Sequence, residues 1–200
     1  NFDILIDVVV RKINTFKKNF LKEDNVKYIE GDLSNKKFVH HVFSKKKYDI
    51  VYNFASSSFV QNKELSKLSS QLLNNFSIIS NILESIVITK SSPWLLHPLS
   101  SEIFGMSKKK YQNEKSDFNP TNMYGISKVT ELFLCRYYEK NYMLKIFRPI
   151  LYNHESIFRS EEFFSKKVFS MIEKIKNKDG ESHILEFYNS ESKRDWGYAP

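Results

Sequence analysis

Short apolar runs that alternate with amphipathic stretches limit the fold of this chain more than any other feature. Residues 4–10 form an apolar run that only Asp7 interrupts, as is typical of a strand buried on both faces of a parallel sheet. Further runs predict strands over residues 26–29, 49–55, 94–99 and 144–147.

The segments between these runs carry apolar residues at helical spacings of three and four. Helices are expected over residues 36–46, with Ser34 as the N-cap, and over residues 65–85. A third helix is expected to carry Tyr124, and Asn119 before a proline marks its start. Strand and helix alternate without repeats, which predicts an α/β fold with a doubly wound parallel sheet.

The pattern changes after residue 150. A helix over residues 161–178 and a strand over 184–188 are expected there, with a turn at Gly180 between them. The sequence therefore predicts a sheet domain over residues 1–150 and the beginning of a smaller region over residues 151–200.

Composition excludes several classes of protein. The net charge of +8 suggests nucleic acid, but only five of the 31 basic residues are arginine and the lysines are scattered, so no nucleic-acid partner is expected. Cys135 is the single cysteine, which rules out an internal disulfide. No apolar stretch reaches the length of a membrane span, so a cytoplasmic protein without a membrane partner is expected.

The pattern Tyr-x-x-x-Lys occurs twice, and only one match has a structural context. Tyr111 lies in a stretch without apolar periodicity and is interpreted as a solvated side chain. Tyr124 and Lys128 open an amphipathic helix, so they lie one turn apart on one face. Ser100 and Glu102 follow a predicted strand. A hydroxyl, a carboxylate, a phenol and an ammonium can thus meet in one crevice of the sheet, as an active site requires.

Other polar positions have two interpretations from the residues alone. Arg11 is either a charged strand end or a contact for a 2′-phosphate. The serines at 56–58 form either a plain turn or a close approach to a ligand. The Asn-His-Glu sequence at 153–155 reads as a turn, and Arg194 with Asp195 as a surface ion pair. His97 is interpreted as a packed core histidine.

Six motifs together resemble the extended short-chain dehydrogenase/reductase family, and within it the group of GDP-mannose 4,6-dehydratases. They are Gly-Asp-Leu at 31–33, Tyr-Asn-Phe-Ala at 52–55, Ser-Ser-Glu-Ile-Phe-Gly at 100–105, the Tyr124/Lys128 pair, Asn-His-Glu-Ser at 153–156 and Arg-Asp-Trp-Gly at 194–197. The Tyr-Lys pair marks the whole superfamily. Ser-Glu at 101–102 after the catalytic strand, Asn-His-Glu-Ser and Arg-Asp-Trp-Gly together point to the dehydratases.

The resemblance implies a reaction that converts GDP-mannose to GDP-4-keto-6-deoxy-mannose with NADP. Tyr124, its pKa lowered by Lys128, would take the proton of the 4-hydroxyl, and Ser100 would hydrogen-bond the same oxygen. Glu102 would remove the C5 proton before water leaves C6. The resemblance makes residues 1–150 the NADP-binding domain and residues 151–200 the beginning of the nucleotide-sugar region.

The same resemblance assigns binding residues. Those implied to hold NADP are Arg11, Asp32, Leu33, Ala55, Ser57, Tyr124, Lys128 and His154. Those implied to hold the GDP-sugar are Asn153, Arg159, Glu162, Lys166 and Arg194. A homo-oligomer of the full-length protein is also expected.

This sequence departs from the family pattern in several places. No glycine precedes Gly31, so a glycine loop is not seen, and a fragment without that loop and without the C-terminal region is expected. Lys166 stands where arginine is usual, and Ser-Ser-Ser-Phe at 56–59 replaces Ala-Gln-Ser-His. An epimerase or 4-reductase of the same family, or a non-catalytic NADP-binding member, remain alternatives. Glu102 and the complete catalytic set argue against them.

Overall fold

The computed structural model describes residues 4–13, 24–58, 65–107, 111–160, 163–176 and 195–199. It divides into two compact units, Asn1–Ile150 and Leu151–Pro200. Each unit is described by itself.

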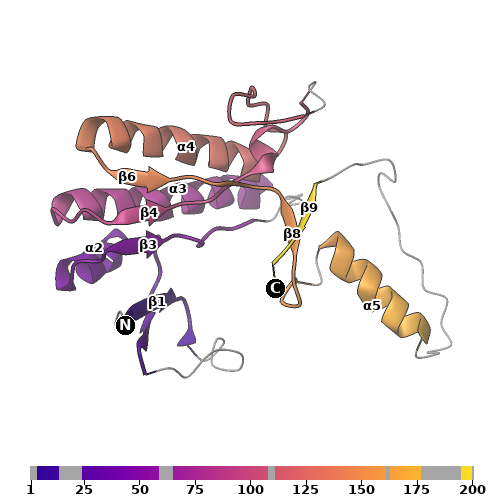
Figure 1. Cartoon of the computed structure of the whole chain (residues 1–200), viewed down its shortest axis with the longest axis horizontal. Coiled ribbons are helices and arrows are strands. Elements are labelled where there is room, and N and C mark those ends of the chain that lie inside the picture. The colour runs from indigo at the N-terminus through magenta and orange to yellow at the C-terminus, as the bar shows by residue number, and fades with distance from the viewer. Residues whose placement is uncertain are drawn as a thin grey trace. The chain divides into compact units, whose positions relative to one another are not determined.

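Five strands of the first unit pair in parallel. Strand β1 (Ile6–Val10) pairs with β2 (Val26–Glu30). A three-stranded sheet has the order β3 (Ile50–Tyr52), β4 (Trp94–Leu96) and β6 (Lys145–Phe147) (Figure 1). Parallel neighbours need long crossover connections, and the chain supplies helices for them. The predicted parallel α/β arrangement is confirmed.

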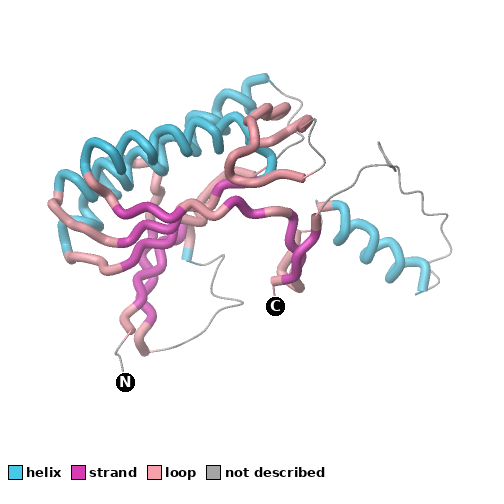
Figure 2. The backbone as a smooth tube through the Cα atoms, turned by 45° about the horizontal axis from the view of Figure 1, so that its top comes forward, coloured by secondary structure: helices cyan, strands magenta, loops and turns pink. Residues whose placement is uncertain are grey.

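Three helices cover one face of the three-stranded sheet: α2 (Lys36–Lys45), α3 (Leu65–Ile88) and α4 (Met123–Tyr142). Figures 1 and 2 show α3 and α4 side by side over this sheet. Their contact buries a continuous apolar core, whose members include Val39, Phe43, Ile79, Leu83, Leu95 and Ile146. Burying each large apolar side chain contributes roughly 1.5–3 kcal/mol, so this core fixes where α4 lies on the sheet.

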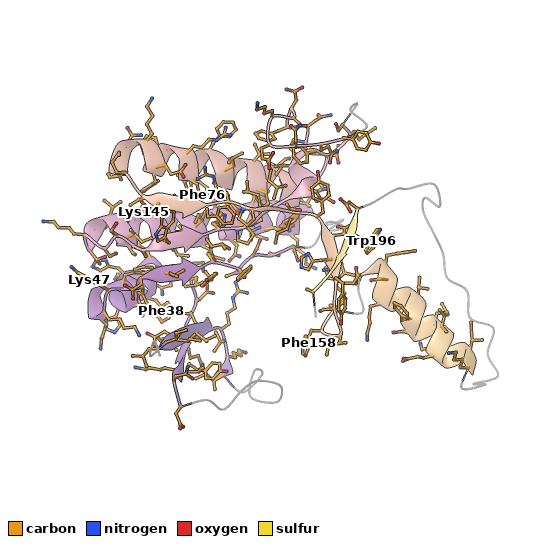
Figure 3. All side chains as sticks on the ribbon, viewed as in Figure 1. Phe38, Lys47, Phe76, Lys145, Phe158 and Trp196 are labelled. Carbon is orange, nitrogen blue, oxygen red and sulfur yellow. The ribbon has the colours of Figure 1, made fainter. Side chains whose placement is uncertain are left out.

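The opposite face of the sheet is open among the described residues. Ile50, Trp94 and Phe147 are each more than half exposed, whereas Leu95 and Ile146 between them are buried under the helices. Lys145 also lies on this open side, with Nζ 5.6 Å from the Trp94 ring centroid (Figure 3). The expectation that the strands are buried on both faces is therefore wrong for the part of the chain that the structure describes.

The strand predicted over residues 94–99 is two strands. Strand β4 ends at Leu96, and β5 (Leu99–Ser100) is separate. Pro98 interrupts the pairing because proline has no N–H to donate. The interruption leaves His97 between the two strands, with its backbone N–H donating to the Phe147 carbonyl at 2.9 Å.

Two predicted helix starts are also wrong. The side chain of Asn35, not Ser34, caps α2 by accepting from the Phe38 N–H. Ser34 instead donates to Asp32. Helix α4 is capped by Asn122, three residues after Asn119. In both places asparagine satisfies a free N–H of the first turn.

The second unit contains a strand pair and one helix. Strand β8 (Asn153–Glu155) pairs in parallel with β9 (Trp196–Tyr198), and α5 spans Phe164–Lys176. Residues 153–155 are therefore a strand, not the predicted turn. The strand predicted over 184–188 lies outside the described residues. None of the described helices combines the length and apolarity that a membrane span requires.

One glycine is required where the chain passes close to itself before α4. Gly105 has a φ of +47°, and a Cβ there would lie 1.9 Å from the Asn119 carbonyl oxygen.

We expect Gly105→Ala to lower the free energy of unfolding by about 1–3 kcal/mol, measured by chemical denaturation. Gly197→Ala is the matched control, because the atoms nearest to its Cβ lie at 3.8 Å. Equal stability of the two variants would contradict this explanation.

Candidate active site

Ser100 and Glu102 are held together by a short turn. Ser100 ends β5 and caps the 3-10 helix η1 (Ser101–Ile103), where its Oγ accepts from the Glu102 N–H at 3.3 Å. Both side chains are half-buried. The hydroxyl and the carboxylate are therefore delivered to the same place, as the sequence predicted.

The first turn of α4 packs directly on this turn. Asn122 donates from Nδ2 to Glu102 Oε2 at 2.6 Å, and its Oδ1 accepts from the Gly125 N–H at 2.8 Å. Gly125 allows the close approach, because a Cβ there would lie 2.5 Å from the Glu102 carbonyl oxygen. The helix start that carries Tyr124 is thus fixed against the segment that carries Glu102.

Tyr124 lies between the other candidate catalytic groups. Its side chain is hydrogen-bonded to that of Ser100, and Lys128 Nζ lies 5.7 Å from its ring centroid. Burial and the charges of Glu131 and Glu102 raise the pKa of Tyr124 to about 12, although the Ser100 hydrogen bond lowers it. The expected lowering of this pKa by Lys128 is wrong for this arrangement.

The reason is the partner of Lys128. Lys128 is 3% exposed, and its Nζ donates to Glu131 Oε2 at 2.8 Å. The same oxygen lies 2.8 Å from His97 Nε2. The Glu131 carboxylate therefore largely compensates the effect of the Lys128 charge on Tyr124. His97 is a buried side chain, as predicted, but it belongs to this group of charges.

Glu131 was missed by the sequence reasoning. A signal for it existed: Glu131 lies three residues after Lys128, on the same apolar stripe as Leu132 and Cys135. Residues three apart on a helix are neighbours, so a carboxylate at that position on a buried face predicts an ion pair with Lys128.

Arg11 and Asp32, both assigned to NADP, lie together after the ends of β1 and β2. Arg11 Nε is 3.7 Å from Asp32 Oδ2, and both side chains are largely exposed. Hydrogen bonds from Ser34 and the Arg11 charge hold the pKa of Asp32 below its usual range. Leu33 follows, half-buried, and its carbonyl accepts from Asn81.

The loop after β3 carries Ala55 and Ser57 and is tied to α3. Ser57 N–H donates to Asn75 Oδ1 at 2.8 Å, and Asn75 Nδ2 donates back to the Ser57 carbonyl at 3.1 Å. Asn75 also reaches Ser127 Oγ at 3.1 Å, so the loop is connected to the helix of Tyr124. Sequence reasoning missed Asn75, which is buried within a helix of mixed polarity.

The residues assigned to the sugar nucleotide lie in the second unit or outside the described residues. Asn153 and His154 are on β8, and Lys166 is half-buried on α5. Arg159 lies over the Phe163 ring at 3.5 Å, with Nε 3.6 Å from Glu155 Oε2. Glu162 and Arg194 are outside the described residues. No group of three or more His, Cys, Asp or Glu side chains gathers to hold a metal in the described ranges.

Solved structures share this architecture. A dTDP-glucose 4,6-dehydratase of Streptomyces venezuelae, crystallised with NAD, superposes with a TM-score of 0.80 at 16% identity over 98% of this chain and 59% of that chain. A UDP-N-acetylglucosamine 4-epimerase of Methanobrevibacter ruminantium gives 0.79 at 17% identity over 96% of this chain and 60% of that chain. These likenesses confirm the Rossmann-like fold of extended short-chain dehydrogenases/reductases.

Sequence relatives narrow the assignment. A GDP-mannose 4,6 dehydratase of Dictyostelium discoideum is 27% identical over 205 residues, covering 98% of this chain and 56% of that protein. One of Drosophila melanogaster is 35% identical over 100 residues, covering 50% of this chain and 25% of that protein. The chain thus spans about half the length of the Dictyostelium discoideum relative. Residues 7–200 match the GDP-mannose 4,6 dehydratase family, and the chain belongs to that family.

Proposed function

We propose that this protein dehydrates GDP-mannose to GDP-4-keto-6-deoxy-mannose with NADP. The observation that carries the proposal is the position of Glu102, which is fixed beside the Ser100 and Tyr124 pair by Asn122. Family membership and the dehydratases among its relatives support it.

Tyr124 is proposed to exchange the proton of the sugar 4-hydroxyl, with Ser100 hydrogen-bonded to the same oxygen. The nicotinamide of NADP, when bound, supplies the site that accepts and returns hydride. Because its pKa is raised to about 12, Tyr124 remains a phenol at neutral pH. Only the phenolate can accept the 4-hydroxyl proton, so the small fraction of Tyr124 that has lost its own proton to solvent is the form that acts as general base when hydride leaves C4.

Glu102 is proposed to remove the proton from C5 once C4 is a ketone. The ketone acidifies that proton, and the C6 hydroxyl then leaves as water with the proton that Glu102 took from C5. Hydride returns to C6 and C5 takes up a proton from solvent, which gives the 4-keto-6-deoxy product. The Asn122 amide holds Glu102 Oε2 at 2.6 Å and thereby orients the carboxylate. Epimerisation and 4-reduction need no base at this position, which is why Glu102 favours dehydration over the two alternatives.

The cofactor assignment fits the chemistry of the first unit. Arg11 is exposed, and among the described residues its guanidinium contacts Asn74 and Asp32. It can therefore turn to a 2′-phosphate, which guanidinium groups bind through paired hydrogen bonds. Asp32 and Leu33 are proposed to flank the adenine, and Ala55 and Ser57 the pyrophosphate and ribose. His154 is proposed to bind NADP.

The GDP-sugar is proposed to bind to a set of polar and charged side chains: Asn153, Arg159, Glu162, Lys166 and Arg194. Arg159 is placed over Phe163 and next to Glu155, so binding a phosphate would require it to exchange a carboxylate for another anion. Lys166 provides a single ammonium and not the planar fork of arginine. We expect its contribution to phosphate binding to be less directional.

Glu102→Gln should lower dehydration by about 10²–10⁴ fold, because the amide retains the shape but cannot take a proton. Formation of the 4-keto-6-deoxy product from GDP-mannose measures this in the full-length protein. Exchange of the C5 proton with deuterated water should fall in parallel. Glu114→Gln, in the exposed loop before α4, is the control. A Glu102→Gln variant that forms the product at a near-native rate would refute the dehydratase proposal.

Tyr124→Phe should abolish turnover while GDP-mannose still binds, because only the phenol oxygen is lost. Tyr111→Phe removes a hydroxyl from a side chain that is 77% exposed, and it should leave turnover unchanged. Steady-state rates and a sugar-nucleotide titration of both variants check this. If Tyr111→Phe were the inactive variant, the wrong Tyr-x-x-x-Lys pair would have been chosen.

Arg11→Ala should narrow the preference for NADP over NAD by about 1.5–3 kcal/mol, the usual contribution of hydrogen bonds to a charged group. Titration of each cofactor into the full-length protein measures the two dissociation constants. Lys12→Ala, which removes the adjacent exposed cation, should change the preference less. Equal affinity of the unmodified protein for both cofactors would refute the role of Arg11.

A further inference from the structure

Two buried residues beside the candidate catalytic groups have no part in the mechanism above. Glu131 and His97 are each 1% exposed, and they lie against Lys128, which is 3% exposed. Two nitrogen atoms each lie 2.8 Å from Glu131 Oε2: Lys128 Nζ on the same helix, and His97 Nε2 on the segment between β4 and β5. The other carboxylate oxygen, Oε1, is buried without a hydrogen-bond partner among the described residues.

The hydrogen bonds of Asn53 determine where the proton of His97 lies. Asn53 Oδ1 accepts from the Ala55 N–H at 3.2 Å, so its amide nitrogen faces the other way. That nitrogen lies 3.1 Å from His97 Nδ1, which must accept because an amide nitrogen only donates. His97 is therefore the neutral tautomer that carries its proton on Nε2 and donates it to Glu131.

The charges of the group then balance. Burial lowers the pKa of His97, which agrees with a neutral ring. Burial alone would raise the pKa of Glu131, but the His97 hydrogen bond and the Lys128 charge hold it below its usual range. One carboxylate thus faces one ammonium. A buried ammonium without that partner tends to lose its proton, because desolvation disfavours the charged form.

We infer that Glu131 is a positioning residue that keeps Lys128 protonated and fixed beside Tyr124, and that His97 anchors Glu131 for this task. The inference rests on the proposed function insofar as Lys128 serves catalysis.

The arrangement has an opposing effect on Tyr124. The Glu131 charge helps to raise the pKa of Tyr124, as does Glu102 from η1. Arg148, which follows β6, faces His97 and opposes its protonation together with Lys128. Removing Glu131 would therefore lower the pKa of Tyr124 directly. Loss of the Lys128 proton would raise it again, so Lys128 itself must be observed.

The test follows Lys128 by NMR of the side-chain ¹³Cε signals, assigned with Lys128→Met. In Glu131→Gln the pH midpoint at which Lys128 loses its proton should fall by at least about one unit, a tenfold change in the proton equilibrium. Glu139→Gln is the matched control: it removes the partner of Arg148 two turns further along α4 and should leave the midpoint unchanged. An unchanged midpoint in Glu131→Gln would overturn the inference.

Glu131→Asp retains the negative charge, so its Lys128 midpoint should lie close to that of the unmodified protein. If Glu131→Gln does not fold, an unchanged midpoint in His97→Leu would refute the proposal. His97→Leu removes the donor to the carboxylate and should shift the midpoint in the same direction by a smaller amount.

Kinetics separate this role from a merely structural one. The alkaline limb of the kcat profile for dehydration should move to lower pH in Glu131→Gln, with the KM for GDP-mannose little changed, and Glu131→Asp should restore it. A uniform loss of rate at all pH values would contradict a positioning role. If the unmodified protein makes no product but the NMR midpoints shift as expected, the proposed function fails and the inference about Lys128 stands.

Discussion

The buried charge of Lys128 sets the conditions that the surrounding structure must meet. An ammonium that is 3% exposed needs a counter-charge, and Glu131 supplies it. The carboxylate in turn needs a second donor, which is His97, and His97 needs Asn53. Removing one member of such a buried pair costs about 3–5 kcal/mol. The network therefore ties α4 to the segments that follow β3 and β4, the edge of the sheet where the candidate catalytic groups lie.

A close backbone approach completes the site on the other side of Tyr124. Gly125 lets the first turn of α4 pack on the Glu102 carbonyl, and Asn122 uses one amide both to cap that helix and to hold the Glu102 side chain. Helix α4 is thus fixed by two contacts: the Asn122–Glu102 hydrogen bond at its start and the buried His97–Glu131 hydrogen bond further along. Tyr124 lies between these contacts, so a shift of Tyr124 along the helix axis would break them.

Periodicity predicted the larger elements because burial imposes it. Helix α4 and the parallel strands β1, β2, β3 and β6 lie where apolar spacing places them. Finer features depended on local competition. Pro98 divides an apolar run that otherwise reads as one strand, and Asn122 takes the cap because its side chain also reaches Glu102. Such choices are made by contacts across the fold, which no window of sequence contains.

The sequence predicted that the four candidate catalytic residues lie together, but it did not predict their electrostatics. Ser100, Glu102, Tyr124 and Lys128 come together as their positions in the sequence suggested. The direction in which the pKa of Tyr124 shifts could not be predicted from the sequence, because the spacing of a Tyr-x-x-x-Lys motif does not show which other groups face the lysine. Glu131 compensates the ammonium, and desolvation then raises the pKa of the phenol. At neutral pH only the small phenolate fraction of a tyrosine with such a pKa can accept a proton, so the proposed removal of the 4-hydroxyl proton depends on prior ionisation of Tyr124.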